Sequence, residues 1–165
     1  MSTNPYAPPK AVVADIAPRQ DSPPLWNPNA AANWSLLLSP AFGAFLQMKN
    51  WEELGEPAKA AASKAWVIAV LAILVALPLA IVLVPALSSL QNVSSPVGLV
   101  LLISWYVSSG RAQVRYVKER FGKDYPRRGW GRPLFMAVLA LLGYVVVVGI
   151  LAAVLAPAVA IAGKS

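Results

Sequence analysis

The stretch WVIAVLAILVALPLAIVLVPAL, residues 66–87, decides the fold because it is strongly apolar and contains no charged residue. As an α-helix it would be about 33 Å long, which matches the roughly 30 Å hydrocarbon core of a bilayer. Pro78 and Pro85 lie inside it and are expected to kink it. Membrane helices tolerate such prolines where a neighbouring helix satisfies the freed carbonyls. The stretch therefore predicts a transmembrane helix over residues 66–88.

Two further apolar segments indicate a multi-pass membrane protein. Residues 96–110 begin with a proline, which suits the first turn of a helix, and form the second predicted span. We expect this helix to continue as a basic extension to Phe121 and to stop near Gly122. Residues 133–162 form the third predicted span, which is longer than a bilayer core and should tilt or project.

A shorter apolar segment, residues 33–49, fits two arrangements. Asn33 could cap a helix that starts at Trp34. The apolar part before Lys49 would be only about 22 Å long as a helix, shorter than a bilayer core. Polar or small residues recur every four positions and should lie on one side: Ser35, Ser39, Gly43 and Gln47. We predict a re-entrant or interfacial helix, with a short fourth span as the alternative. The expected fold class is an all-α integral membrane helical bundle.

The composition supports this class and excludes several kinds of chemistry. Hydrophobic residues make up 58% of the 165 residues and charged residues only 13%, about half the usual share for a soluble domain. Cysteine and histidine are absent, which excludes disulfides, thiolate metal sites and imidazole acid–base catalysis. We therefore expect no catalytic, cofactor-binding or metal site, and no enzyme activity.

The acidic cluster Glu52, Glu53 and Glu56 could in principle bind a hard cation. Glu52 and Glu53 precede a predicted helix start, where the helix dipole favours negative charge. Lys49 and Lys59 are close enough in sequence to neutralise the cluster. We therefore interpret it as structural.

The first 32 residues are rich in proline, which disfavours helix and strand, and are expected to form a disordered tail before a membrane domain over residues 33–165. A tyrosine between prolines can present an aromatic ring on a polyproline scaffold. The tail therefore contains a candidate docking motif, Pro5, Tyr6, Pro8 and Pro9, with a plain disordered tail as the favoured alternative.

Positive charge is concentrated between the second and third predicted spans, over residues 111–132, whereas residues 88–96 carry no charge. The positive-inside rule then places the basic loop in the cytoplasm. Its cations are candidate contacts for anionic lipids, although they could also do no more than set topology. They are Arg111, Arg115, Lys118, Arg120, Lys123, Arg127, Arg128 and Arg132. Beside two spans, their aromatic neighbours fit interface anchors better than a nucleic-acid surface, so we expect no nucleic-acid partner.

The leader Asn4-Pro5-Tyr6-Ala7-Pro8-Pro9 resembles that of small proteobacterial multi-pass membrane proteins, including RDD-like ones. The segment Trp34–Ala44 is similar to the half-buried first segment of uncharacterised families of that kind. The resemblance implies a location in the bacterial inner membrane and favours a cytoplasmic tail. These families share no agreed activity, so no functional residue can be transferred.

These observations lead to two hypotheses for the function. The first is a non-enzymatic scaffold or accessory subunit that binds membrane or cytoplasmic partners, or forms a homo-oligomer. The alternative is a small oligomeric channel or transporter for an uncharged solute, lined by Ser104, Ser108 and Ser109. A single subunit lacks ionisable residues inside its predicted spans, which argues against a proton relay or a charged substrate.

Overall fold

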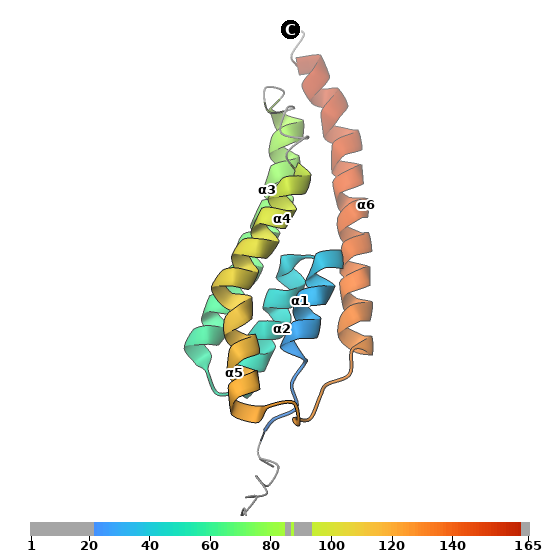
Figure 1. Cartoon of the computed structure of the whole chain (residues 1–165). Helices are drawn as coiled ribbons and strands as arrows, with labels where there is room; N and C mark the ends of the chain where they lie inside the picture. Colours follow the sequence, from blue (N-terminus) through green and yellow to red (C-terminus); the bar gives the residue numbers. More distant parts are fainter. Residues whose placement is uncertain (1–21, 85–86, 88–93, 163–165) are drawn as a thin grey trace, which may run out of the picture.

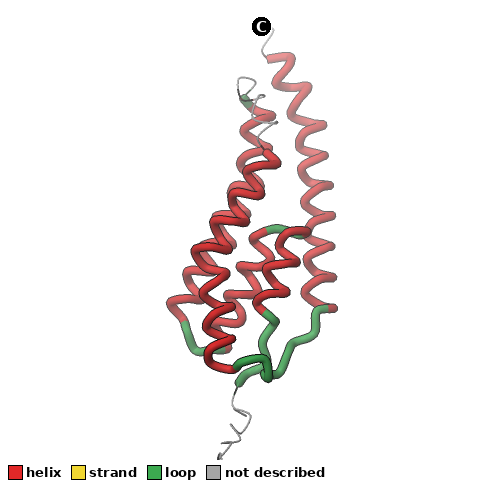
Figure 2. Tube along the Cα trace, in the orientation of Figure 1, coloured by secondary structure: helices red, strands yellow, loops and turns green. Residues whose placement is uncertain are grey.

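The computed structural model describes residues 22–84, 87 and 94–162, and their regular secondary structure is helical throughout (Figures 1 and 2). The elements in order are α1 Pro28–Leu37, α2 Pro40–Glu53, α3 Pro57–Leu83, α4 Ser94–Trp105, the π-helix η2 Tyr106–Gly110, α5 Arg111–Phe121 and α6 Gly131–Ala162. The predicted all-α fold is confirmed for these residues. Among the described helices, α3 and α6 are long and apolar enough to cross a membrane.

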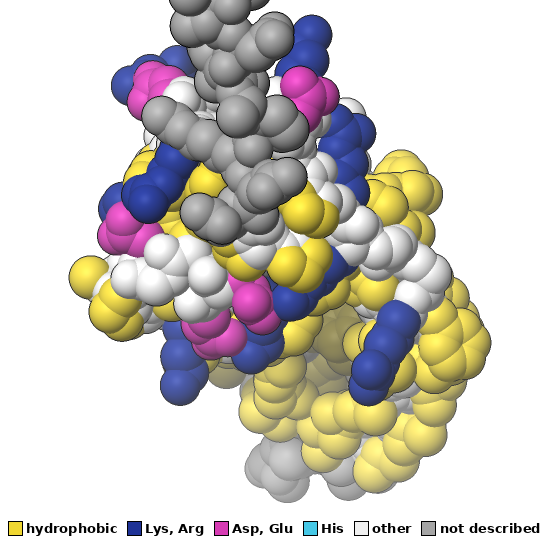
Figure 3. All heavy atoms as spheres, turned by 90° about the horizontal axis from the view of Figure 1, so that it is seen from below, with side chains coloured by type: hydrophobic (Ala, Val, Ile, Leu, Met, Phe, Trp, Pro, Cys, Tyr) yellow, Lys and Arg dark blue, Asp and Glu magenta, His cyan; other side chains and the backbone are white. Residues whose placement is uncertain are grey.

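The long helices run side by side, and most of the polar connections gather at one end (Figure 1). The "basic end" comprises residues 22–27, the turn 54–56 between α2 and α3, and the loop 122–130 between α5 and α6. Figure 3 looks onto this end and shows charged side chains gathered there, with hydrophobic side chains covering the part that extends away. The bundle is therefore polarised along its length.

The α4–η2–α5 run confirms the predicted basic extension. The three pieces follow one another without a break and end at Phe121, as expected. Gly122 then takes φ +67°, a backbone conformation that favours glycine, and its N–H donates to the Lys118 carbonyl at 3.0 Å. The π-helix in the middle of this run was not predicted.

The segment predicted as one short helix over residues 33–49 is instead part of a hairpin of two helices. The first helix begins at Pro28, where the Asn27 side chain accepts from the Asn29 N–H at 3.0 Å, so Asn33 is not its cap. The predicted tail boundary at residue 32 consequently lies inside α1. Residues 1–21, including Pro5, Tyr6, Pro8 and Pro9, lie outside the described residues.

Pro40 explains why the hairpin turns. A residue that precedes proline is disfavoured in the helical conformation, and Ser39 is extended, with φ 175° and ψ 162°. Its hydroxyl then caps α2 by accepting from the Phe42 N–H at 3.4 Å. The chain therefore enters and leaves the α1–α2 hairpin at the basic end (Figure 1).

The α1–α2 hairpin packs into the lower half of the bundle, where α2 makes its main contacts with α1 and α3. Gly43 lies at the closest approach: a Cβ there would collide with the Ser35 hydroxyl and the Trp105 ring. The stripe predicted on one helix is therefore split between two helices, with Ser35 on α1 and Gly43 and Gln47 on α2.

Helix α6 is attached to α3 partly through a hydrogen bond that Pro78 makes necessary. Proline has no N–H, so the Leu74 carbonyl four residues earlier lacks its helical donor. The Tyr144 hydroxyl donates to that carbonyl at 2.8 Å. The expectation that a neighbouring helix satisfies the freed carbonyl is thus confirmed for Pro78; Pro85 lies outside the described residues.

The outer surfaces of α3 and α6 are apolar and open. Only 6% of the most apolar window of α3, and none of that of α6, is buried inside the structure. Contiguous exposed apolar surface of this extent marks a membrane or a protein interface. Together with their length, it suggests that the protein is associated with a membrane.

The Tyr144 hydrogen bond gives a test of this packing. Tyr144→Phe should destabilise the fold by about 1 kcal/mol, because hydrogen bonds between membrane helices average roughly 0.6 kcal/mol with larger values at buried groups. In the Pro78→Ala background the same change should cost little, because residue 78 then supplies its own N–H to Leu74. Thermal unfolding of the four variants in detergent gives the coupling. Tyr106→Phe is the control, since no hydrogen bond is found for that hydroxyl within the described residues. Equal effects of Tyr144→Phe in both backgrounds would contradict the explanation.

Candidate functional site

A group of buried side-chain amides joins α2 to the α4–η2–α5 run. Gln47 is the first of them: its carbonyl oxygen accepts from the Trp105 indole N–H at 3.1 Å and from the Ser109 hydroxyl at 3.2 Å. Its amide nitrogen donates to the Ser109 backbone carbonyl at 2.7 Å. Both Gln47 and Trp105 are almost fully buried. The Gln47 side chain therefore makes hydrogen bonds to both the backbone and the side chain of Ser109 in η2.

Gln113 and Asn50 continue the group toward the basic end. The Gln113 side-chain amide nitrogen donates to the Gln47 backbone carbonyl at 2.9 Å, and the Gln113 side-chain oxygen accepts from the Asn50 amide nitrogen at 3.1 Å. Both side chains are buried. Among the described residues, the buried side-chain polar atom without a partner is the Ser22 hydroxyl, so every amide in this group is satisfied. A satisfied buried network of this kind fixes one arrangement of its helices.

Asn50 also holds the segment that leads into α1. Its amide nitrogen donates to the Trp26 carbonyl at 2.8 Å, and its oxygen accepts from the Trp26 N–H at 3.0 Å. The side chain thus pairs with both backbone groups of Trp26, as a neighbouring strand would. Residues 22–27 are therefore bound to α2 before the hairpin begins.

The loop between α5 and α6 binds the same segment from the other side. The Leu25 N–H donates to the Pro126 carbonyl at 3.0 Å, and the Leu25 carbonyl accepts from the Arg128 N–H at 2.9 Å, which makes an isolated parallel bridge. The Leu25 side chain is completely buried. The Trp26 indole N–H donates to the Gly129 carbonyl at 3.2 Å. We call these contacts, with those of Asn50, the Trp26 clamp.

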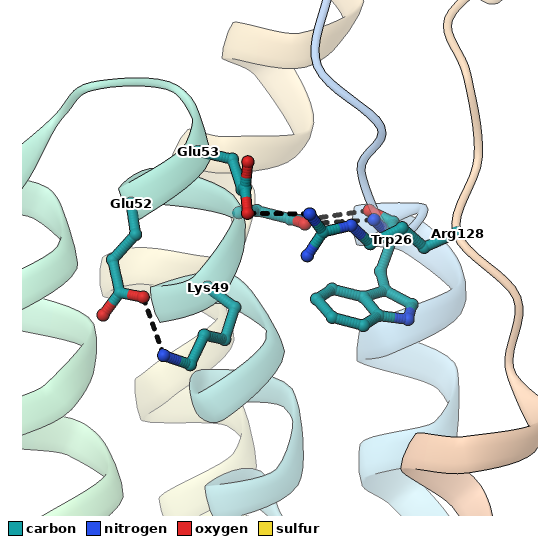
Figure 4. Close-up of polar contacts among 6 residues, drawn as sticks. Trp26, Lys49, Glu52, Glu53 and Arg128 are labelled. Carbon is teal, nitrogen blue, oxygen red and sulfur yellow. Dashed lines mark hydrogen bonds and ion pairs between the residues drawn. The ribbon is translucent and has the colours of Figure 1, made fainter.

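Arg128 completes the clamp with its charge. Its guanidinium lies between Glu53 and Trp26, 2.7 Å from a Glu53 carboxylate oxygen and 4.7 Å from the centre of the Trp26 ring (Figure 4). The ion pair links the loop to α2, and the cation–π contact links the loop to residues 22–27. One side chain thereby joins three segments that are distant in sequence.

Three of the predicted basic residues make contacts within the protein, and the other five are exposed. Arg128 belongs to the clamp. Arg120 donates to the Tyr116 hydroxyl at 2.7 Å, and Arg127 donates to the Lys123 carbonyl at 3.3 Å while facing the Tyr125 ring. The other side chains are exposed and form no ion pair with a described residue: Arg111, Arg115, Lys118, Lys123 and Arg132.

Each carboxylate of the acidic cluster forms an ion pair with a lysine or arginine of the same chain. Glu52 pairs with Lys49 at 2.8 Å and Glu56 with Lys59 at 3.2 Å, as the neutralising role of these lysines predicted. Glu53 pairs with Arg128 instead. Glu52 and Glu53 precede the start of α3 at Pro57, as expected, but they lie in the last turn of α2, where the helix dipole does not favour negative charge. Within the described residues, no group of acidic side chains could hold a metal ion.

Glu56 sits against an aromatic and cationic group at the start of α3. Hydrogen bonds from Lys59 and then from the Tyr116 hydroxyl hold the pKa of the Glu56 carboxyl below its ordinary value. Because the folded pKa is lowered, this pairing stabilises the fold above the ordinary carboxyl pKa and is lost as the pH falls through the lowered value. The Tyr116 ring in turn packs edge-on against Trp51, with 5.0 Å between ring centroids.

Two of the three serines considered as pore-lining residues donate hydrogen bonds within the subunit. The Ser108 hydroxyl donates to the Ser104 carbonyl at 2.6 Å, and the Ser109 hydroxyl donates to Gln47. These hydrogen bonds stay within one subunit.

No protein-family model, curated protein or solved structure matches the chain. The resemblance of the leader to that of RDD-like proteins therefore stays an expectation. The candidate site rests on the described residues alone.

Sequence reasoning missed both the amide network and the clamp. Gln47 was noticed only as part of a stripe, and Asn50 and Gln113 were not singled out. Uncharged amides at the edges of apolar segments were the available indication, because a buried amide must find a partner. Which amides meet is decided by the hairpin turn and by η2, which the sequence pattern did not predict.

Asn50→Leu tests the clamp. The change leaves the Trp26 N–H and carbonyl and the Gln113 oxygen without partners, so we expect a loss of about 2–4 kcal/mol in the free energy of unfolding. Thermal unfolding in detergent measures this loss, and limited proteolysis near residue 26 should become faster. Asn33→Leu, at an exposed position of α1, is the matched control. Equal stability and equal cleavage of the two variants would refute the role given to Asn50.

Proposed function

We propose that this chain is a non-enzymatic, multi-pass inner-membrane scaffold that holds its proline-rich N-terminal segment at the membrane surface for protein partners. The Trp26 clamp is the observation that carries the proposal. Six hydrogen-bonding or charged contacts hold residues 25 and 26 against α2 and the α5–α6 loop. A tail without a role in binding would not require its exit point to be fixed in this way.

The three long helical runs support a multi-pass arrangement. Residues 65–83, 94–110 and 133–162 are free of charged side chains. Each uncharged part would be about 25 Å or more in length, close to the thickness of a bilayer core. The proposal therefore adds the α4–η2–α5 run as a third span beside α3 and α6.

The α1–α2 hairpin fits a re-entrant position in this arrangement. Residues 22–48 carry no charge, and Lys49 is the first charged residue after them. From Lys49 to Pro40, α2 rises by about 13 Å, less than half of a bilayer core. The hairpin would dip into the membrane and return to the same side, which brings the N-terminal segment to the side of the basic loop.

The distribution of charge gives the orientation in this proposal. The basic end would face the cytoplasm, since short cytoplasmic loops are enriched in lysine and arginine. The partners of the N-terminal segment would then be cytoplasmic proteins or the cytoplasmic parts of other membrane proteins. The channel alternative has less support, because the hydroxyls of Ser108 and Ser109 donate within the subunit.

Labelling of single cysteines tests the topology, because the chain has no native cysteine. Thr3→Cys and Lys123→Cys should be protected from an impermeant maleimide in intact cells and react after permeabilisation. Ser89→Cys and Ser165→Cys should react in intact cells. Reaction of Thr3→Cys before permeabilisation would contradict the re-entrant hairpin and favour a fourth span.

Affinity purification from mild detergent tests the scaffold function. The wild-type chain should co-purify with a stoichiometric partner protein or a second copy, and Tyr6→Ala/Pro8→Ala should lose a partner that binds the N-terminal segment. Thr3→Ala/Pro18→Ala changes the same region outside the docking motif and should retain it. A wild-type chain that purifies alone and monomeric would contradict the proposal.

A further inference from the structure

The exposed face of α5 carries a row of cations that form no ion pair with any described residue. Arg111, Arg115 and Lys118 follow one another at intervals of four and three residues, so their side chains share one face of the helix. All three are exposed, whereas Gln113 and Val117, on another face of α5, are buried against the bundle. The row therefore points away from the folded core. We call it the α5 stripe.

No described acidic side chain neutralises the α5 stripe. The three ion pairs of the described residues use Lys49, Lys59 and Arg128. Glu119 lies four residues after Arg115, a spacing that allows an ion pair on a helix, yet none forms between them. The favourable effect of the helix C-terminus accounts for a cation at Lys118 but not for Arg111 and Arg115, which lie further from that end.

The position of the stripe along the helix limits what could bind it. Arg111 directly follows the uncharged residues 94–110, so the stripe begins where the apolar surface of the run ends. From Arg111 to Lys118 the helix rises by about 10 Å. The headgroup region of one leaflet is roughly 5–8 Å thick, half of the difference between a full bilayer and its core. Arginine and lysine side chains reach a few ångströms along the helix, so all three charges can lie in this layer.

We propose that the α5 stripe binds the phosphate groups of anionic phospholipids in the leaflet at the basic end. The guanidinium groups of Arg111 and Arg115 can each form two parallel hydrogen bonds to a phosphate, and Lys118 adds a point charge. This assigns lipid binding to three of the eight predicted residues and assigns Arg120, Arg127 and Arg128 to contacts within the protein. The assignment rests on the proposed membrane position of the α4–η2–α5 run but not on any partner of the N-terminal segment.

Lipid binding to the full-length chain tests this assignment. The protein is purified in a neutral detergent, phosphatidylglycerol or phosphatidylcholine is added, and bound lipids are counted by native mass spectrometry. The wild-type chain should prefer phosphatidylglycerol. In Arg111→Gln/Arg115→Gln/Lys118→Gln that preference should fall on the order of a hundredfold, since each cation near an anionic surface contributes roughly fivefold.

A matched variant separates the stripe from net charge. Lys10→Gln/Arg19→Gln/Lys164→Gln also removes three positive charges, all from positions outside the described residues. It should keep the wild-type preference. An equal fall in both triple variants, or no fall in the stripe variant, would overturn the proposal. The single change Arg115→Gln, expected to lower the preference about fivefold, serves if the triple variant does not fold.

A soluble competitor separates a lipid site from a site for free phosphate esters. Glycerol phosphate at millimolar concentration should leave phosphatidylglycerol bound, because it lacks the acyl chains that keep the headgroup beside the apolar part of the run. Displacement at that concentration would show that the stripe takes soluble phosphates, and would overturn the lipid assignment. Failure of these experiments would leave the scaffold proposal untouched, since that proposal is judged by co-purification.

Discussion

A buried amide must find hydrogen-bond partners, and this requirement organises the basic half of the bundle. Gln47 and Asn50 lie on the same helix, three residues apart, and every partner they use comes from another segment. Leaving such a group unpaired in an apolar interior costs several times the free energy that one extra apolar contact contributes. The hairpin therefore cannot slide or rotate against the α4–η2–α5 run without breaking contacts that the surroundings cannot replace.

Apolar packing between the helices would be a weaker constraint in a bilayer. Lipid tails are as apolar as leucine, so burying leucine against another helix contributes little to association there. This fits the sparse contacts of α6, which meets α3 along part of its length and is otherwise open. Polar contacts hold α6 in place. The Tyr144 hydroxyl donates to the Leu74 carbonyl, and the loop before α6 carries Arg128, which pairs with Glu53 in the clamp. Polar contacts, few in number, decide the arrangement of elements that are mostly apolar.

The helices were predictable because their cause is local. The length and composition of an uncharged apolar run such as residues 66–83 are enough to predict a helix. Gly122 likewise indicates the end of α5, because the backbone there takes a positive φ that favours glycine. The hairpin turn at Ser39–Pro40 was missed because hydrophobicity alone does not distinguish one short helix from two shorter ones, although the pre-proline restriction was readable there. The Trp26 clamp could not be predicted, since Trp26 and Gly129 are brought together only by the path of the chain between them.

That clamp also has a consequence for how the protein is made. The Trp26 indole and its acceptor at Gly129 are 103 residues apart, so the ribosome has produced all of α1 to α5 before the second half of the clamp exists. The hydrogen bond to the Leu74 carbonyl likewise cannot form until Tyr144, 70 residues later, has been synthesised. Residues 25 and 26 thus make their full set of contacts only once the α5–α6 loop has been synthesised. A product that ends before Gly129 would keep the Asn50 contacts to Trp26 but lack those of the α5–α6 loop, so a complete clamp reports that synthesis has reached the loop before α6.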